Sequence, residues 1–262
     1  MQRIGVIGGL GWMAQAMIQP ALENNALTPE QLLLSSRRKD LKCPLSENIR
    51  VLTDNQTLVD QVDCVVLAIK PEDFLALQVD LKGKLVLSIM AGVSMQTIEE
   101  HTGATHVIRA MPNAAAELGE SCTGYVASES CTQEELEQAI AFMQPSGMLV
   151  PLNNESELNA FTAFIGSGHG WMAYFADSII QSMQRYGFDG DLSQQSVRQL
   201  CRGAGMLVAQ EEESPSDTVN KMTTYAGTTA AGLVAMSEYG IAESIHESLI
   251  ASLEKANSNM TQ

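Results

Sequence analysis

The feature that most constrains the fold is an alternation, along the first half of the chain, of short apolar runs with amphipathic stretches. The apolar runs occupy residues 4–7, 32–34, 62–69, 85–89, 106–108 and 148–152. The run CVVLAI at 64–69 lacks the polar alternation of a half-exposed strand, which predicts strands covered on both faces. Repeated strand and helix units of this kind predict an α/β fold with a doubly wound, mainly parallel sheet.

Three helix starts are marked between these runs. Thr97 with Glu100 and Thr132 with Glu135 both have the spacing of a capping box. Pro71 directly follows the run AIK, where a helix can begin with proline in its first turn. We therefore expect helices to begin at these three places.

Beyond about residue 153 the strand-like runs stop and helical patterns replace them. The expected helices are 155–186, 193–213, one that begins near 227, and 241–257. Gly187 and Gly240 occupy positions typical of C-terminal caps, and EEESPSD at 211–217 is expected to be a loop. We predict a sheet domain at 1–153 followed by an all-α domain at 154–262.

The composition excludes several classes of partner. Lys and Arg total 15 against 31 Asp and Glu, a net charge of −16 that opposes binding to nucleic acid or anionic lipid. The 5 cysteines are scattered without a C-x-x-C pair, which favours neither disulfides nor a metal site. Neither a leader pattern nor an apolar run of about 20 residues is visible, so we expect a cytoplasmic protein with no membrane span.

The first apolar run ends in a glycine-rich turn, GGLGWMA. Gly9, Gly11 and Ala14 have the spacing G-x-G-x-x-A between an expected strand and an expected helix, which is typical of a dinucleotide-binding, Rossmann-type turn. In this interpretation Gly9 permits the tight turn, Gly11 lets a pyrophosphate approach the backbone, and Ala14 lets helix and strand pack closely. Gly8 lies outside the motif. An ordinary glycine-rich turn is the alternative.

The end of the second expected strand, LLLSSRRKD, indicates which dinucleotide binds. An NAD enzyme usually has an acidic residue here for the ribose 2′-hydroxyl. Ser35, Ser36, Arg37 and Arg38 instead offer hydroxyl and guanidinium groups to a 2′-phosphate. This rare basic cluster in an acidic chain favours NADP over NAD, with a solvated loop as the alternative.

Segments spread over nearly the whole chain resemble the pyrroline-5-carboxylate reductases. The matching strings are Gly11-Trp12-Met13-Ala14, Ser35-Ser36-Arg37, Asn55, Ala68-Ile69-Lys70-Pro71, Ala91-Gly92-Val93, Arg109-Ala110-Met111-Pro112-Asn113, Gly166-Ser167-Gly168 and Gly227-Thr228-Thr229. The resemblance implies NADPH-dependent reduction of 1-pyrroline-5-carboxylate to L-proline. It also implies that the all-α part is a dimerisation domain forming a homodimer or larger homo-oligomer.

The resemblance implies roles for individual residues. The cofactor would contact Gly9, Gly11, Trp12, Met13, Ser35, Arg37, Asn55, Ala68, Lys70, Pro71, Ala91, Gly92 and Asn113. Thr229 would hydrogen-bond the imine nitrogen, Thr224 would take the place of a serine, and the amides of Gly227 and Thr228 would hold the substrate carboxylate. A glycine before a helix is a physically sensible carboxylate cradle, although paired threonines there also commonly cap helices. His169, between glycines, is a further candidate for contact with the substrate.

The departures from the family pattern fall mainly on the substrate side. Tyr225 and Ala226 replace Pro and Gly of the family's Thr-Ser-Pro-Gly-Gly-Thr-Thr, and Ala114 follows Asn113 where the family has Thr. Two alternatives therefore stand beside the main expectation. One is a related NADP-dependent reductase for another imine or oxo acid, and the other is a catalytically silent NADP-binding regulatory protein.

Overall fold

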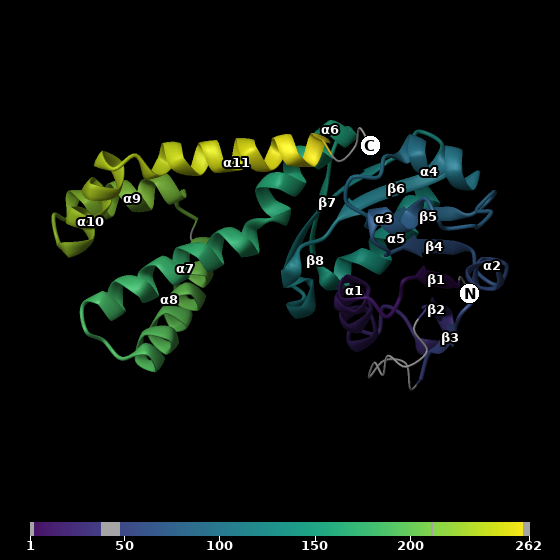
Figure 1. Ribbon diagram of the computed structural model, residues 1–262, viewed down its shortest axis with the longest axis horizontal. Coiled ribbons are helices and arrows are strands. Elements are labelled where there is room, and N and C mark those ends of the chain that lie inside the picture. Colours follow the sequence, from purple (N-terminus) through teal and green to yellow (C-terminus); the bar gives the residue numbers. More distant parts are fainter. Residues whose placement is uncertain (1–2, 38–47, 211, 259–262) are drawn as a thin grey trace. The chain divides into compact units, whose positions relative to one another are not determined.

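The computed structural model describes residues 3–37, 48–210 and 212–258. Arg38 and Cys43 lie outside these residues. An eight-stranded sheet runs in the order β3-β2-β1-β4-β5-β6-β7-β8 (Figure 1). The strands are β1 Ile4–Ile7, β2 Leu32–Ser35, β3 Arg50–Leu52, β4 Cys64–Leu67, β5 Leu85–Ser88, β6 His106–Met111, β7 Ser121–Ala127 and β8 Gly147–Pro151.

The pairing confirms the predicted doubly wound sheet. Neighbouring strands from β3 to β6 are parallel, β7 pairs antiparallel with β6, and β8 pairs parallel with β7. The order 3-2-1-4-5-6 is that of a dinucleotide-binding sheet. All six expected strands are present, whereas β3 and β7 were not expected. Polar residues interrupt β7, SCTGYVA, which hid it in the sequence.

Helices cover both faces of the sheet. One face packs against α1 (Trp12–Glu23) and α5 (Gln133–Met143), and the other against α2 (Asn55–Val59), α3 (Pro71–Phe74) and α4 (Met95–Thr102). Alternation along β1 shows why both faces are apolar, because Val6 belongs to the first core cluster and Ile7 to the second. Short 3-10 turns lie at Pro29–Gln31, Ala114–Leu118 and Gln144–Ser146.

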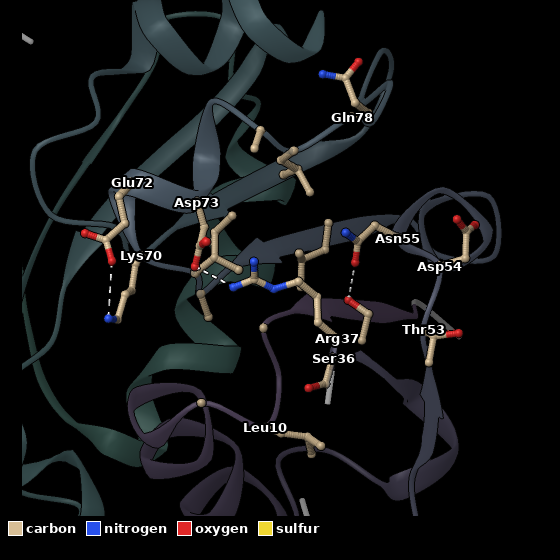
Figure 2. Close-up of a pocket in the computed structure, with 18 residues that line it drawn as sticks. Leu10, Ser36, Arg37, Thr53, Asp54, Asn55, Lys70, Glu72, Asp73 and Gln78 are labelled. Carbon is tan, nitrogen blue, oxygen red and sulfur yellow. Dashed lines mark hydrogen bonds and ion pairs between the residues drawn. The ribbon is translucent and has the colours of Figure 1, made fainter. Parts of the chain in front are cut away.

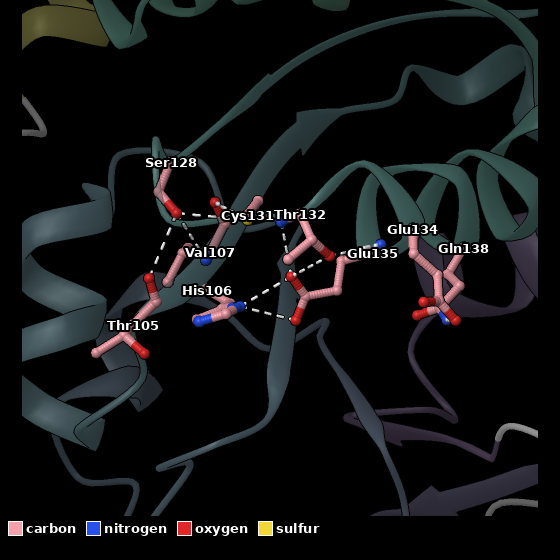
Figure 3. A network of polar contacts seen from close by, with 9 residues as sticks. All are labelled: Thr105, His106, Val107, Ser128, Cys131, Thr132, Glu134, Glu135 and Gln138. Atoms are coloured by element: carbon pink, nitrogen blue, oxygen red, sulfur yellow. Dashed lines mark hydrogen bonds and ion pairs between the residues drawn. The ribbon is translucent and has the colours of Figure 1, made fainter.

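Two of the three expected helix starts are confirmed. Pro71 is the first residue of α3. Thr132 and Glu135 form the expected capping box at α5, where the Glu135 carboxylate also binds His106 of β6 (Figure 3). The prediction for Thr97 is wrong, because the cap of α4 lies three residues earlier: it is the Ser94 hydroxyl, which accepts a hydrogen bond from the Thr97 N–H.

The second half of the described chain is helical after β8. Its helices are α6 Glu155–Phe161, α7 Gly168–Arg185, α8 Gly190–Gln210, α9 Pro215–Thr224, α10 Thr228–Glu238 and α11 Ile241–Ser258. The single helix expected at 155–186 is broken by a π-helical segment, Thr162–Gly166. Helix α9 begins inside the expected loop, with Ser214 as its cap. Gly187 and Gly240 have positive φ after α7 and α10, as C-terminal caps do.

Contacts divide the chain into two compact units. The first unit is Met1–Ser167 with Ser252–Gln262, and the second is Gly168–Ala251. The boundary expected at 153/154 stays a prediction. Within the described residues no helix is long and apolar enough to cross a membrane, and no cluster of His, Cys, Asp and Glu is placed to hold a metal ion.

Candidate cofactor site and substrate loop

The turn after β1 has a backbone shape that depends on glycine at Gly8. Its φ is +82°, and a Cβ there would lie 2.5 Å from the carbonyl oxygen of Ala68. The positive φ of the turn falls on Gly8, whereas Gly9 lies inside the turn that the Gly11 N–H closes on the Gly8 carbonyl at 2.8 Å, and its role as the turn glycine stays a prediction. Gly9 also allows close packing, since its Cβ would lie 2.9 Å from Leu34. The N–H groups of Gly8 and Gly9 both donate to the Ser35 carbonyl at 3.1 Å, which ties the turn to β2.

Gly11 places the N-terminus of α1 at the turn. It is the N-cap residue in an extended conformation, and no side chain caps the helix. A Cβ at Gly11 would lie 3.0 Å from the Gly8 carbonyl oxygen. Ala14 is buried against the sheet, as expected for the packing position. Uncapped N–H groups at a helix N-terminus favour an anion such as a pyrophosphate, so this turn is chemically suited to the group that the motif predicts.

A cavity of about 760 Å³ opens beside this turn (Figure 2). The predicted cofactor residues that line it are Gly11, Ser35, Arg37, Asn55, Ala68 and Lys70. The buried Ser35 hydroxyl donates to the Asn55 side-chain oxygen at 2.7 Å, so the end of β2 and the start of α2 are held together. Residues from four separate strand ends thus meet at one cavity.

Five other predicted residues of this group are not part of the cavity walls. Gly9, Trp12, Met13, Pro71 and Asn113 do not line the described cavities. The exposed Trp12 indole N–H donates to Glu117, and Met13 packs against the core beneath α1. Asn113 caps the 3-10 turn that follows it by accepting from the Ala115 N–H at 3.0 Å. The side chains of Trp12, Met13 and Asn113 therefore have structural contacts, and contact of all five residues with a cofactor stays a prediction.

The sequence interpretation missed the carboxylates in the cavity wall. Asp73 accepts from the Arg37 guanidinium at 2.7 Å, and Glu72 pairs with Lys70 at 3.3 Å (Figure 2). Asp54 also lines the cavity, and hydrogen bonds from Thr57 hold the pKa of its carboxyl below the ordinary value. No local signal identified Asp73, since it lies 36 residues from Arg37 in the sequence.

A second cavity in the first unit, about 190 Å³, contains the predicted residues Ala91 and Gly92. Arg109 lines it, is 1% exposed, and donates to the Glu155 carboxylate at 2.5 Å. Glu155 also accepts from the Met95 N–H at 3.0 Å. One carboxylate therefore links β6 to the start of α4, directly after the loop that carries Ala91 and Gly92. Lys255, near the end of α11, lines the same cavity and was not anticipated.

The predicted substrate residues lie in the second unit. Gly227 is the N-cap of α10 and no side chain caps that helix, so Thr228 and Thr229 are its exposed first residues rather than its caps. Ala226 has φ +56°, the left-handed conformation usual for glycine, at a position where the family pattern has glycine.

Two further predicted substrate residues are also exposed. The Thr224 hydroxyl donates to the Asn220 carbonyl at 2.8 Å, at the end of α9. His169 lies in the first turn of α7.

This sheet order, with a glycine turn and a cavity at the carboxyl ends of its strands, defines a dinucleotide-binding α/β protein. Residues 3–92 match the family model "NADP oxidoreductase coenzyme F420-dependent", and residues 155–259 match "Pyrroline-5-carboxylate reductase dimerisation". The chain is 31% identical to pyrroline-5-carboxylate reductase of Methanosarcina acetivorans, over 97% of both chains. It is 30% identical to pyrroline-5-carboxylate reductase 2 of Bacillus subtilis, over 94% of this chain and 90% of that one. The chain belongs to the pyrroline-5-carboxylate reductase family.

A solved structure extends the likeness to the whole fold. The crystal structure of Plasmodium falciparum pyrroline carboxylate reductase with NADP bound superposes with a TM-score of 0.86, at 21% identity, over 99% of this chain and 98% of that one. At this identity the likeness confirms the fold, and the resemblance inferred from the sequence motifs is confirmed by the family match.

Proposed function

We propose that this chain reduces 1-pyrroline-5-carboxylate to L-proline with NADPH. The observation that carries the proposal is the match to named reductases along 97% of the chain, which includes both the cofactor half and the helical half. The glycine turn and the cavity at the strand ends support the cofactor part. The uncapped N-terminus of α10 supports the substrate part.

The residues divide the work between cofactor and substrate. In the first unit, the N-terminus of α1 would hold the pyrophosphate, Ser35 and Asn55 would hold the adenosine side, and Ala91 and Gly92 would also contact the cofactor. When bound, NADPH supplies the hydride that the imine carbon accepts.

On the substrate side, the N–H groups of Gly227 and Thr228 hold the carboxylate, because free amides at a helix N-terminus attract anions. Thr229 hydrogen-bonds the ring nitrogen, Thr224 assists it, and His169 contacts the substrate. A protonated imine is already electrophilic, so these residues act chiefly by positioning.

We further propose that the active form is a homodimer or a larger homo-oligomer in the cytoplasm. Helices α7, α9 and α11 have no buried residue of their own. Among the described residues of the second unit, Ser193, Val197 and Ala230 are the buried ones. A bundle with so small a core leaves its apolar faces to a partner, and a second copy is the partner that the dimerisation model supports.

The test monitors NADPH oxidation by its absorbance, with 1-pyrroline-5-carboxylate as substrate. NADPH binding is titrated separately by fluorescence. Turnover with product identified as proline supports the proposal. Tight NADPH binding without turnover would reject 1-pyrroline-5-carboxylate as the substrate and favour a different imine. A different imine is the second candidate because Tyr225 is exposed and Ala226 has a strained backbone in the substrate loop, residues 224–229.

A Thr229→Ala variant tests the substrate loop. We expect kcat/KM to fall by about 10² because a positioned hydrogen bond at the reacting nitrogen is lost, with NADPH affinity unchanged. Thr223→Ala is the matched control, since its hydroxyl bonds the Val219 carbonyl within α9. Normal turnover by Thr229→Ala would remove its assigned role.

A further inference from the structure

The charges in the larger cavity do not form a simple basic site. The cationic side chains that line it within the described residues are Arg37 and Lys70, and the carboxylates are Asp54, Glu72 and Asp73. Each cation is already paired, Arg37 with Asp73 at 2.7 Å and Lys70 with Glu72 at 3.3 Å. Figure 2 shows the Arg37 side chain extended across the cavity toward Asp73. A 2′-phosphate that reaches Arg37 therefore meets a carboxylate already bound there.

We propose that Asp73 is a specificity-determining residue that limits the preference for NADPH over NADH by competing with the 2′-phosphate for Arg37. The inference rests on the proposed use of this cavity for NADP(H). A phosphate monoester carries nearly two negative charges at neutral pH and needs the Arg37 guanidinium as a counter-charge, but Asp73 already occupies one nitrogen of that guanidinium and offsets its charge. A ribose 2′-hydroxyl has no charge and donates readily to a carboxylate. The Arg37–Asp73 pair can thus stay undisturbed beside NADH, whereas the 2′-phosphate of NADPH must share Arg37 with Asp73.

The position of the pair sets the size of the effect. The Arg37 side chain is 79% exposed and that of Asp73 is 30% exposed, so water and salt screen the interaction. A pair of this kind changes an equilibrium by up to about fivefold. Asp73 therefore adjusts the ratio of the two affinities, and does not by itself determine whether a dinucleotide binds.

The experiment measures dissociation constants for NADPH and NADH by fluorescence titration, with no imine substrate present. For Asp73→Asn, which keeps the shape of the side chain, we expect the Kd for NADPH to fall by about fivefold and that for NADH to change by less than about twofold. The same shift should appear between adenosine 2′,5′-bisphosphate and adenosine 5′-monophosphate, which lack the nicotinamide.

Two comparisons distinguish competition from a general charge effect. Asp54→Asn removes the same charge from the same wall, and Asp54 accepts from the Thr57 N–H instead of pairing with a cation, so its effect on the ratio should be less than about twofold. In an Arg37→Gln background, Asp73→Asn should also shift the ratio by less than about twofold, because the contested cation is gone. Equal changes for both dinucleotides, an equal shift in Asp54→Asn, or an undiminished shift without Arg37 would each overturn the proposal.

Failure of the proposal for Asp73 and failure of the proposed enzymatic function give different results. If the chain binds NADPH and shows the Asp73→Asn shift but does not reduce 1-pyrroline-5-carboxylate, the substrate is wrong and the role of Asp73 stands. If it reduces that imine and the ratio does not move, the role of Asp73 is wrong and the enzymatic proposal stands.

Discussion

At the residue scale, Gly8 and Gly83 show two different reasons why a position requires glycine: the backbone conformation and the lack of space for a side chain. Both have positive φ, +82° and +74°, but a Cβ at Gly83 would meet nothing within 4 Å, whereas one at Gly8 would meet the Ala68 carbonyl. We expect Gly83→Ala to lower the free energy of unfolding by about 1 kcal/mol, through backbone conformation alone. Gly8→Ala should lower it by about 3 kcal/mol and weaken NADPH binding, because the turn must also move. Urea unfolding and fluorescence titration give both quantities, and an equal loss of stability in the two variants would contradict the steric argument.

The residue scale also shows what the sequence could predict about the site. Ser35, Arg37 and Asn55 belong to short local strings, and the structure brings all three to one cavity. Spacing alone does not reveal φ, so the motif led to Gly9 and passed over Gly8. Asp73 was missed because its role depends on a contact between α3 and the end of β2, which no local pattern records.

At the scale of elements, the start of α5 is held by a carboxylate with several donors. Glu135 accepts from the Thr132 N–H at 2.8 Å, from the Thr132 hydroxyl at 2.9 Å and from His106 at 2.8 Å (Figure 3). Partial burial disfavours the charged form, but the bonds from Thr132 and His106 outweigh it and hold the pKa of Glu135 below its ordinary value. This network joins β6 to α5 and favours the ionised state.

The network predicts a pH-dependent contribution to stability. A carboxyl whose pKa is lowered in the folded state stabilises the fold above its unfolded value, and that contribution disappears as pH falls through the folded value. Glu135→Gln should therefore lower the free energy of unfolding by about 1 kcal/mol at pH 7. Its difference from the unmodified chain should shrink below about pH 4.5.

Thermal unfolding between pH 3 and 7 measures this difference. Glu134→Gln, in the same helical turn, is the control for the loss of one charge, and its effect should be smaller. A difference for Glu135→Gln that does not vary with pH would contradict the mechanism.

The sequence predicted elements well where local chemistry defines them. The capping box at Thr132 and the proline at Pro71 are complete within a few residues, and both helices begin as expected. Helix α9 was missed because its cap and first proline, Ser214 and Pro215, also suit a loop. The π-helical segment Thr162–Gly166 has a helical apolar pattern, so periodicity alone could not reveal the break.

At the scale of the whole molecule, the exposed apolar side chains of the second unit predict self-association. On α8, Leu200 is 52% exposed and Leu207, two turns later on the same face, is 60% exposed. We expect light scattering after gel filtration to give at least twice the chain mass of 28.2 kDa. The double variant Leu200→Glu and Leu207→Glu should lower that mass, because charges would be buried without partners.

Gln195→Glu, an exposed polar position on the same helix, is the control and should keep the mass of the unmodified chain. A monomeric unmodified chain, or a double variant of unchanged mass, would show that this face is not the interface.

The path of the chain through its two units has a consequence for the order of folding. The first unit includes Ser252–Gln262, so it receives its last segment only after all of Gly168–Ala251 has been synthesised. At about 5 to 20 residues per second, the ribosome takes roughly 4 to 17 s over that intervening stretch. During this time the sheet can form, but the smaller cavity lacks the wall that Ser252, Lys255 and Ala256 provide. The nascent chain therefore completes its larger cavity, with the glycine turn, well before its smaller one.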